Sequence, residues 1–280
     1  MSMSDLQPQL EYKRFNAFHR WMHFLGMTSF TVLVFTGMPL KYSNASWAQW
    51  SMDLIGGPEA AGLLHRVAAL VTMVYFISEL VYIGIYVVTR RGPLWGPNTI
   101  MWSRKDGQDF VNMFRWFFGK GPFPQFERFT YWEKFDFWSL TAGTVIIGGT
   151  GLMMWFPVET TKLLPGVALN MALVIHSNEA LLAMGVIFIF VHLFSAHMRP
   201  ESFPIDKVIF TGSIPVEHYR EERPLEYAQR LHDGTLNDVL VPARTGATKH
   251  IGNVAWWFIT FVAMVAAALL AAFILWTVVT

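Results

Sequence analysis

The chain has 280 residues, of which 53% are hydrophobic and 15% are charged. Soluble domains usually have about 45–50% hydrophobic and about 25% charged residues, so this composition excludes a disordered chain and an ordinary cytosolic enzyme. Because the chain has no cysteine, a disulfide scaffold, an iron–sulfur cluster, a thiolate zinc site and a covalently attached c-type haem are excluded as well. The net charge of +1 gives no reason to expect a nucleic-acid partner, and the 12 tryptophans and 24 phenylalanines indicate an integral membrane protein.

Five stretches are apolar and long enough to cross a hydrocarbon layer of about 30 Å, which takes about 20 helical residues. None alternates with a period of two, so helices are favoured over barrel strands. The stretches are Trp21–Leu40, Gly62–Val88, Phe137–Pro157, Val167–Phe194 and Val254–Val279. The sequence therefore predicts an all-α integral membrane protein: a four-helix transmembrane bundle over 1–199, a cytoplasmic extension over 200–253 and a fifth C-terminal transmembrane helix over 254–280.

The cationic residues predict the orientation of these spans. Eighteen of the 21 lysines and arginines lie in the N-terminal segment or in the loops after spans two and four. Because cytoplasmic loops carry the excess of Lys and Arg, we expect the N-terminus in the cytoplasm and the C-terminus on the outside.

Spans one and two carry ionisable groups at two depths. His23 lies near the cytoplasmic end of span one, and His65 near the outer end of span two. Such groups are costly in a bilayer and usually mark function, although a histidine hydrogen-bonded within the bundle is the alternative for each one. Glu79 follows His65 by fourteen residues, about 21 Å deeper on an ideal helix. It is a candidate proton acceptor beside a quinone, or a partner of Arg20 or of a backbone group.

The loop between spans two and three contains an aromatic, basic segment, Asp109–Phe118, followed by Lys120. This pattern is typical of a segment lying in the membrane interface, and an aromatic belt flanking span three is the alternative. Asn98 in the same loop is a further candidate for a quinone site. Span three carries no histidine, and its run Gly148–Gly151 favours a wall of a cofactor chamber.

Span four carries His176 in its outer half and His192 and His197 towards its cytoplasmic end. On an ideal helix, His192 lies about 24 Å from His176 but about 160° round, whereas His197 lies about 60° round but about 31 Å away. A π-bulge would rotate His192 towards the inner face. Depth favours His192 as an inner ligand, with His197 left as an alternative. The later segment Val216–His232 is a predicted helix.

The predicted depths in the membrane place His65 and His176 together nearer the outer side, and His23 together with His192 or His197 nearer the cytoplasmic side. Two histidines from facing helices are what a bis-imidazole haem b requires, and such a haem needs no thioether. The sequence therefore predicts two haem b groups, each held without a covalent bond. Glycines in the spans would let a flat macrocycle or a neighbouring helix approach; they are Gly26, Gly37, Gly143, Gly148, Gly149, Gly151 and Gly185.

Two segments carry a family resemblance: Arg14–Gly37 (RFNAFHRWMHFLGMTSFTVLVFTG) and Ile175–Pro200 (IHSNEALLAMGVIFIFVHLFSAHMRP). They resemble the bacterial di-haem cytochrome b family, which forms the membrane subunit of nickel–iron hydrogenases and respiratory formate dehydrogenases. The resemblance covers about the first two hundred residues. It implies a bacterial inner membrane location, and haem ligation that maps onto His23, His65, His176 and His192, with Arg20 opening the first-span motif.

Phe129–Asp136 (FTYWEKFD) and Arg199–Gly212 (RPESFPIDKVIFTG) resemble more closely a branch paired with periplasmic multihaem c-type cytochromes. That resemblance implies electron exchange with a quinone, menaquinone or ubiquinone, and with such a cytochrome or another redox subunit. His197, Glu79 and Asn98 are the quinone candidates. A proton-coupled transporter and a haem-free membrane anchor are the alternative functions, and both predict a protein without a visible chromophore.

Overall fold

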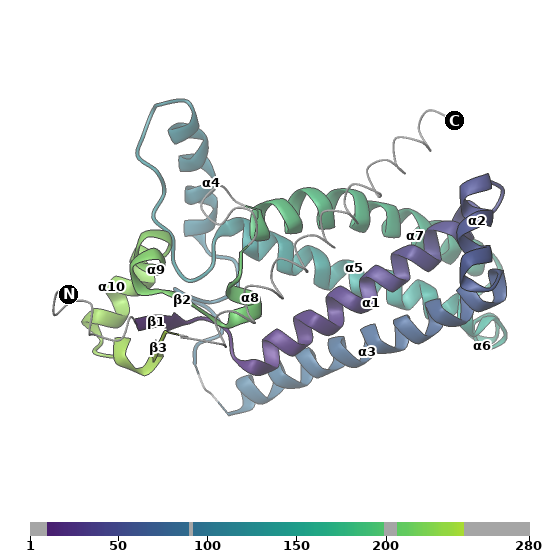
Figure 1. Cartoon of the computed structure of the whole chain (residues 1–280), viewed down its shortest axis with the longest axis horizontal. Coiled ribbons are helices and arrows are strands. Elements are labelled where there is room, and N and C mark those ends of the chain that lie inside the picture. Colours follow the sequence, from purple (N-terminus) through teal and green to yellow (C-terminus); the bar gives the residue numbers. More distant parts are fainter. Residues whose placement is uncertain (1–9, 90–91, 199–205, 244–280) are drawn as a thin grey trace. The chain divides into compact units, whose positions relative to one another are not determined.

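The computed structural model describes residues 10–89, 92–198 and 206–243 (Figure 1). They belong to two compact units. Of the described residues, the bundle unit comprises 21–89, 92–94 and 135–190, and the polar unit comprises 10–20, 95–134, 191–198 and 206–243. The expected fifth span, Val254–Val279, lies outside the described residues.

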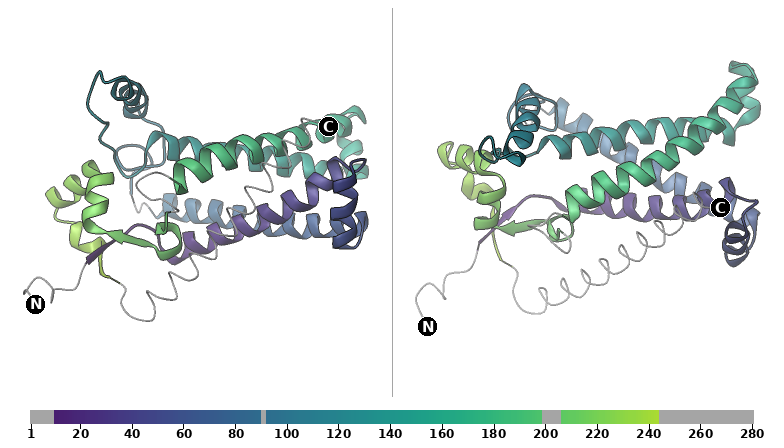
Figure 2. Two further views of the ribbon diagram at one scale, coloured as in Figure 1. Left: turned by 45° about the horizontal axis from the view of Figure 1, so that its top comes forward. Right: turned by 90° about the horizontal axis from the view of Figure 1, so that it is seen from above.

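Four long helices form the bundle unit and run alongside one another in the views of Figures 1 and 2. They are α1 (Ala17–Lys41), α3 (Pro58–Val88), α5 (Tyr131–Trp155) and α7 (Val167–Leu182), which continues as the π-helix η2 (Ala183–His197). Short helices α2 (Ser46–Ile55) and α6 (Pro157–Leu163) lie in the connections. The four long helices are apolar and long enough to cross a membrane, which confirms the first four predicted spans and the all-α membrane bundle.

The side chains of the bundle are distributed as lipid requires. Large apolar residues such as Ile77 and Leu173 are exposed, whereas Ser29, Ala68 and Ala172 are buried between helices. Small residues let helix backbones approach closely in a bilayer, where apolar side chains gain little from leaving lipid for protein.

The polar unit contains a three-stranded antiparallel sheet in the order β2 (Ser213–Pro215), β1 (Leu10–Lys13), β3 (Leu240–Pro242). Tyr12 lies opposite Ile214 on one side and Leu240 on the other. Helices α8 (Val208–Thr211), α9 (Val216–Glu222) and α10 (Pro224–His232) and the 3₁₀ turn η4 (Leu236–Val239) complete this part. The prediction of one continuous helix over Val216–His232 is wrong, because the segment forms the two helices α9 and α10. Pro224 disfavours helical geometry at the residue before it and is itself the first residue of α10.

Glu226 is buried at the centre of the part of the polar unit that the sheet and helices α8, α9 and α10 form. Its carboxylate accepts hydrogen bonds from Tyr12 at 2.8 Å and from Tyr219, and pairs with Arg128 at 3.1 Å and Arg230 at 2.9 Å. Burial raises the pKa of Glu226, but Arg128 and the hydrogen bonds from Tyr219, Arg230 and Tyr12 outweigh it and hold the pKa below its usual range. Burial and the nearby carboxylate raise the pKa of Tyr12 to about 12, so Tyr12 stays a donor.

A second ionic cluster joins the N-terminal segment to the start of α5. Thr130 and Glu133 cap the helix reciprocally: Thr130 donates to the Glu133 carboxylate, and the Glu133 backbone N–H donates to Thr130 Oγ1. The same carboxylate pairs with Arg14 at 2.7 Å and Arg223 at 3.0 Å. One residue further along, Lys134 is fully buried and pairs with Asp106 at 2.9 Å.

Candidate functional site

His65 on α3 and His176 on α7 come together within the bundle unit. Their ring centres lie 6.2 Å apart. A metal–imidazole bond of about 2 Å on each side, plus roughly 1 Å from each bonding nitrogen to its ring centre, would give roughly 6 Å between the ring centres of two histidines that bind one metal ion from opposite sides. The separation therefore fits one metal ion held between the two rings.

A threonine and a backbone carbonyl orient each ring. Thr36 Oγ1 lies 2.9 Å from His65 Nδ1, and because this hydroxyl donates to the Val32 carbonyl, it accepts from the histidine. His65 also makes a hydrogen bond to the backbone of Leu33. This arrangement favours the tautomer with the proton on Nδ1, which leaves the Nε2 lone pair available to a metal.

His176 is held in the same way by α5. Its Nδ1 lies 2.9 Å from the Ile147 carbonyl and 3.4 Å from Thr150 Oγ1. Thr150 donates to the Ile146 carbonyl, so it too presents a lone pair to the histidine. Both rings thus present Nε2 as the ligand atom.

The residue after each threonine is a glycine against which the histidine ring packs. A Cβ at Gly37 would lie 3.0 Å from His65 Cε1, and one at Gly151 would lie 3.1 Å from His176 Cε1. Both distances are shorter than ordinary van der Waals contact, so only glycine fits here without displacing a ring. At Gly148 and Gly149 an added Cβ would meet nothing within 4 Å, so these two leave open space along α5.

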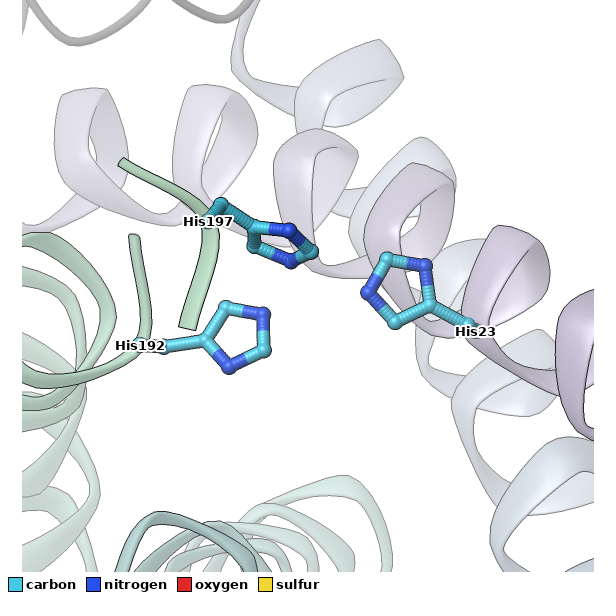
Figure 3. Close-up of side chains that lie close together, drawn as sticks. All are labelled: His23, His192 and His197. Atoms are coloured by element: carbon cyan, nitrogen blue, oxygen red, sulfur yellow. The ribbon is translucent and has the colours of Figure 1, made fainter. Parts of the chain in front are cut away.

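The inner histidines of span four lie on the π-helix η2. Its i→i+5 bonding is visible where Met198 N–H donates to the Leu193 carbonyl at 2.9 Å. Residues five apart therefore stack, and the rings of His192 and His197 lie 4.9 Å apart (Figure 3). The azimuths of an ideal α-helix do not apply to this segment, and the two histidines lie on one side of it. Which of them is an inner ligand stays a prediction.

His197 is the more enclosed of this pair. It is 8% exposed, its ring stacks near Phe210 at 6.4 Å, and its carbonyl accepts from the Asp206 N–H at 2.7 Å. Figure 3 also labels His23, which α1 carries in the bundle unit. The pairing of His23 with an inner ligand of span four stays a prediction.

The remaining quinone candidates lie on different elements. Glu79 lies on α3, one turn after Tyr75, and is partly buried. Asn98 has a positive φ of 63°, donates to Gln229 at 2.7 Å and accepts from the Arg128 N–H at 2.9 Å. Its amide thus anchors the loop before helix α4 (Arg104–Phe117) to α10, and its role at a quinone stays a prediction.

Sequence reasoning named the histidines and the glycines but missed the supporting threonines. The signal was a dipeptide, Thr36-Gly37 in span one and Thr150-Gly151 in span three, that occurs once in each of the two helices without an outer histidine. The threonine before each of these glycines, considered together with it, would have predicted both hydrogen-bond partners of the histidines.

A comparison with protein families matches residues 14–202 to the family described as prokaryotic cytochrome b561. The match covers well over half of the chain and all the histidines discussed above, and the chain belongs to this family. It is a multi-pass membrane cytochrome b that binds haem b and transfers electrons. A comparison with curated proteins gives no match.

Proposed function

We propose that this cytochrome holds two b haems and passes electrons between the quinone pool and a periplasmic redox partner. His65 and His176 would hold the outer haem, and His23 and His192 would hold the inner one. The observation that carries the proposal is the 6.2 Å separation of the outer rings, with both Nδ1 atoms held by hydrogen bonds. The partner is a multihaem c-type cytochrome or another redox subunit.

The residues of the outer site hold their ligand atoms in place before haem binds. A bound b haem supplies one-electron chemistry, because its iron alternates between ferric and ferrous states. Thr36 and the Leu33 backbone fix the tautomer of His65, and Thr150 and the Ile147 carbonyl fix that of His176. Since the two rings need little reorientation, the side chains of the site would move little between the ferric and ferrous states of a bound haem.

At the inner level we assign the neighbouring histidines two separate roles. His192 binds the inner haem, and His197, 4.9 Å away, exchanges a proton with menaquinol or ubiquinol on the cytoplasmic side. Glu79 is the second proton-carrying group at that depth. The excess of cations in the N-terminal segment and the long loops supports a cytoplasmic N-terminus and a periplasmic C-terminus.

The decisive measurement is the pyridine haemochrome content per chain. We expect two haems in the parent protein, and one in each of the variants His65→Ala and His176→Ala. His232→Ala is the matched control, because that side chain is 88% exposed, and it should keep both haems. A parent value near zero would favour the transporter or anchor functions, and a value near one would remove one of the two levels.

The quinone site has its own test. Glu79→Gln removes a titratable proton but keeps the size of the side chain, so it should slow quinol turnover while both haems remain bound. A quinone-site inhibitor should perturb the spectrum of the inner haem. Unchanged turnover in both Glu79→Gln and His197→Ala, or inhibitor binding beside the outer haem, would contradict this assignment.

A further inference from the structure

Helix α4 (Arg104–Phe117) is attached to the polar unit mainly through its first half. Its N-terminus is closed by a capping box in which Ser103 and Asp106 bond to each other's backbone groups. Asp106 pairs with the buried Lys134, and the ring of Phe110 lies 5.6 Å from that of Tyr131. Beyond these contacts, Figures 1 and 2 show the helix and the loop after it extending away from the sheet of the same unit.

The two residues that hold α4 lie in the first turn of α5. Tyr131 begins this helix, and Lys134 follows one turn later. Because α5 is a membrane span, its first turn lies at the level of the lipid headgroups, where tyrosine and tryptophan are enriched. The contacts to Tyr131 and Lys134 therefore place α4 beside the first turn of a membrane span.

The exposed part of α4 has one aromatic face. Phe110, Phe114 and Phe117 lie on one side of the helix and are 50%, 52% and 74% exposed, and Phe118 after them is 66% exposed. A soluble surface helix buries its apolar stripe, so an exposed stripe of this size requires another apolar phase.

The rest of the surface of α4 carries polar side chains beside the exposed Val111 and Trp116, and its exposed charges are all positive. Both acidic residues of α4 are buried in ion pairs, Asp106 with Lys134 and Asp109 with Lys105. Arg104, Arg115 and the following Lys120 are exposed. A hollow opens on this surface, lined by Arg104, Gly107, Gln108, Val111, Asn112 and Arg115. Exposed cations beside an aromatic face are complementary to a surface of phosphate groups over acyl chains.

We propose that α4 lies on the anionic phospholipid surface of the membrane that the bundle spans. Phe110, Phe114 and Phe117 insert among the upper acyl carbons, while the arginines bury their methylene groups and place their guanidinium groups among the headgroup phosphates. This interaction is separate from haem and quinone binding. It fixes the loop between α3 and α5 to one side of the membrane.

The absence of cysteine from the parent chain allows a direct test in the full-length protein. Phe118→Cys carries a fluorophore next to the aromatic face without removing its three phenylalanines, and Ala228→Cys, exposed on α10, is the matched control. Each labelled protein is placed, one copy per nanodisc, in phosphatidylcholine or in a phosphatidylcholine–phosphatidylglycerol mixture. A fraction of the lipid carries a nitroxide near the top of its acyl chain as the quencher.

We expect quenching several times stronger at position 118 than at 228, and stronger again in the anionic mixture. The triple variant Arg104→Gln/Arg115→Gln/Lys120→Gln should lose this anionic increment, since each cation near such a surface contributes roughly fivefold to binding. Equal quenching at 118 and 228 would overturn the proposal. If the stronger quenching in the anionic mixture survives in the triple variant, the assignment of the three cations to headgroup phosphates is wrong. If the label at position 118 is protected from quenching only when two copies share a nanodisc, the aromatic face contacts a second copy instead.

Discussion

Gly37→Ala should weaken the outer haem site by steric pressure alone. The new Cβ would lie 3.0 Å from His65 Cε1 and 3.4 Å from Nδ1, so the ring must move by a few tenths of an ångström. That movement either lengthens the 2.9 Å contact to Thr36 or tilts Nε2 away from the iron. Overpacking of this kind costs about 1–3 kcal/mol, equivalent to roughly a fivefold to hundredfold loss of affinity for the outer haem.

Gly84→Ala is the matched control, because it introduces the same methyl group into a bundle helix, at an exposed position of α3 where nothing lies within 4 Å. It should leave haem binding unchanged and, because alanine is the better helix former, stabilise its helix by up to about 1 kcal/mol. The assay is haem retention during competition with apomyoglobin, followed with the low-spin electron paramagnetic resonance signal of each haem. Equal retention and equal signals in the two variants would refute the steric argument.

Three further predictions test neighbouring parts of the protein. Thr36→Val should shift the midpoint potential of the outer haem more than Thr150→Val, because the contacts to the ring nitrogens are 2.9 and 3.4 Å; equal shifts would contradict the role of these bonds. His192→Ala should lose the inner haem, whereas His197→Ala should keep it and slow quinol turnover; the reverse result would exchange their roles. Glu226→Gln should cost about 3 kcal/mol of stability at pH 7, since it leaves two arginines without their carboxylate. Because the pKa of Glu226 is lower in the folded than in the unfolded protein, its charged carboxylate stabilises the fold above about pH 4.5, and this stabilisation decreases as the pH falls. The difference in Tm between Glu226→Gln and the parent should therefore narrow between pH 7 and pH 4.

The membrane architecture was predictable because its signal is local. Some 20 consecutive apolar residues have few alternatives to a spanning helix, and the four described spans begin and end within a few residues of the predicted bounds at most of their ends. The depth of each histidine followed directly, and His65 and His176 meet across the bundle as their depths required. An ideal-helix calculation failed only in η2, since nothing in the composition of Ala183–His197 distinguishes a π-helix from an α-helix.

The polar unit was not predictable in the same way because its elements are short and far apart in sequence. Strand β1 has four residues and pairs with strands some two hundred residues later, so no local periodicity reveals it. The segment Phe129–Asp136, noticed only as a family resemblance, contains Thr130, Glu133 and Lys134, which cap α5 and hold Arg14 and Asp106. These contacts give the distinctive composition of the segment a role in folding.

The outer site is built twice from the same parts. In α1 and in α5, a threonine presents its lone pair to a histidine Nδ1, the following glycine makes room for the ring, and a carbonyl or backbone group three residues before the threonine completes the support. Each histidine belongs to the next long helix along the chain, α3 or α7, so each half of the bundle supplies one histidine and its own support. Since the supports lie on separate helices, neither ring depends on the other for its orientation, and both Nε2 atoms would be available to a metal without rearrangement of the rings.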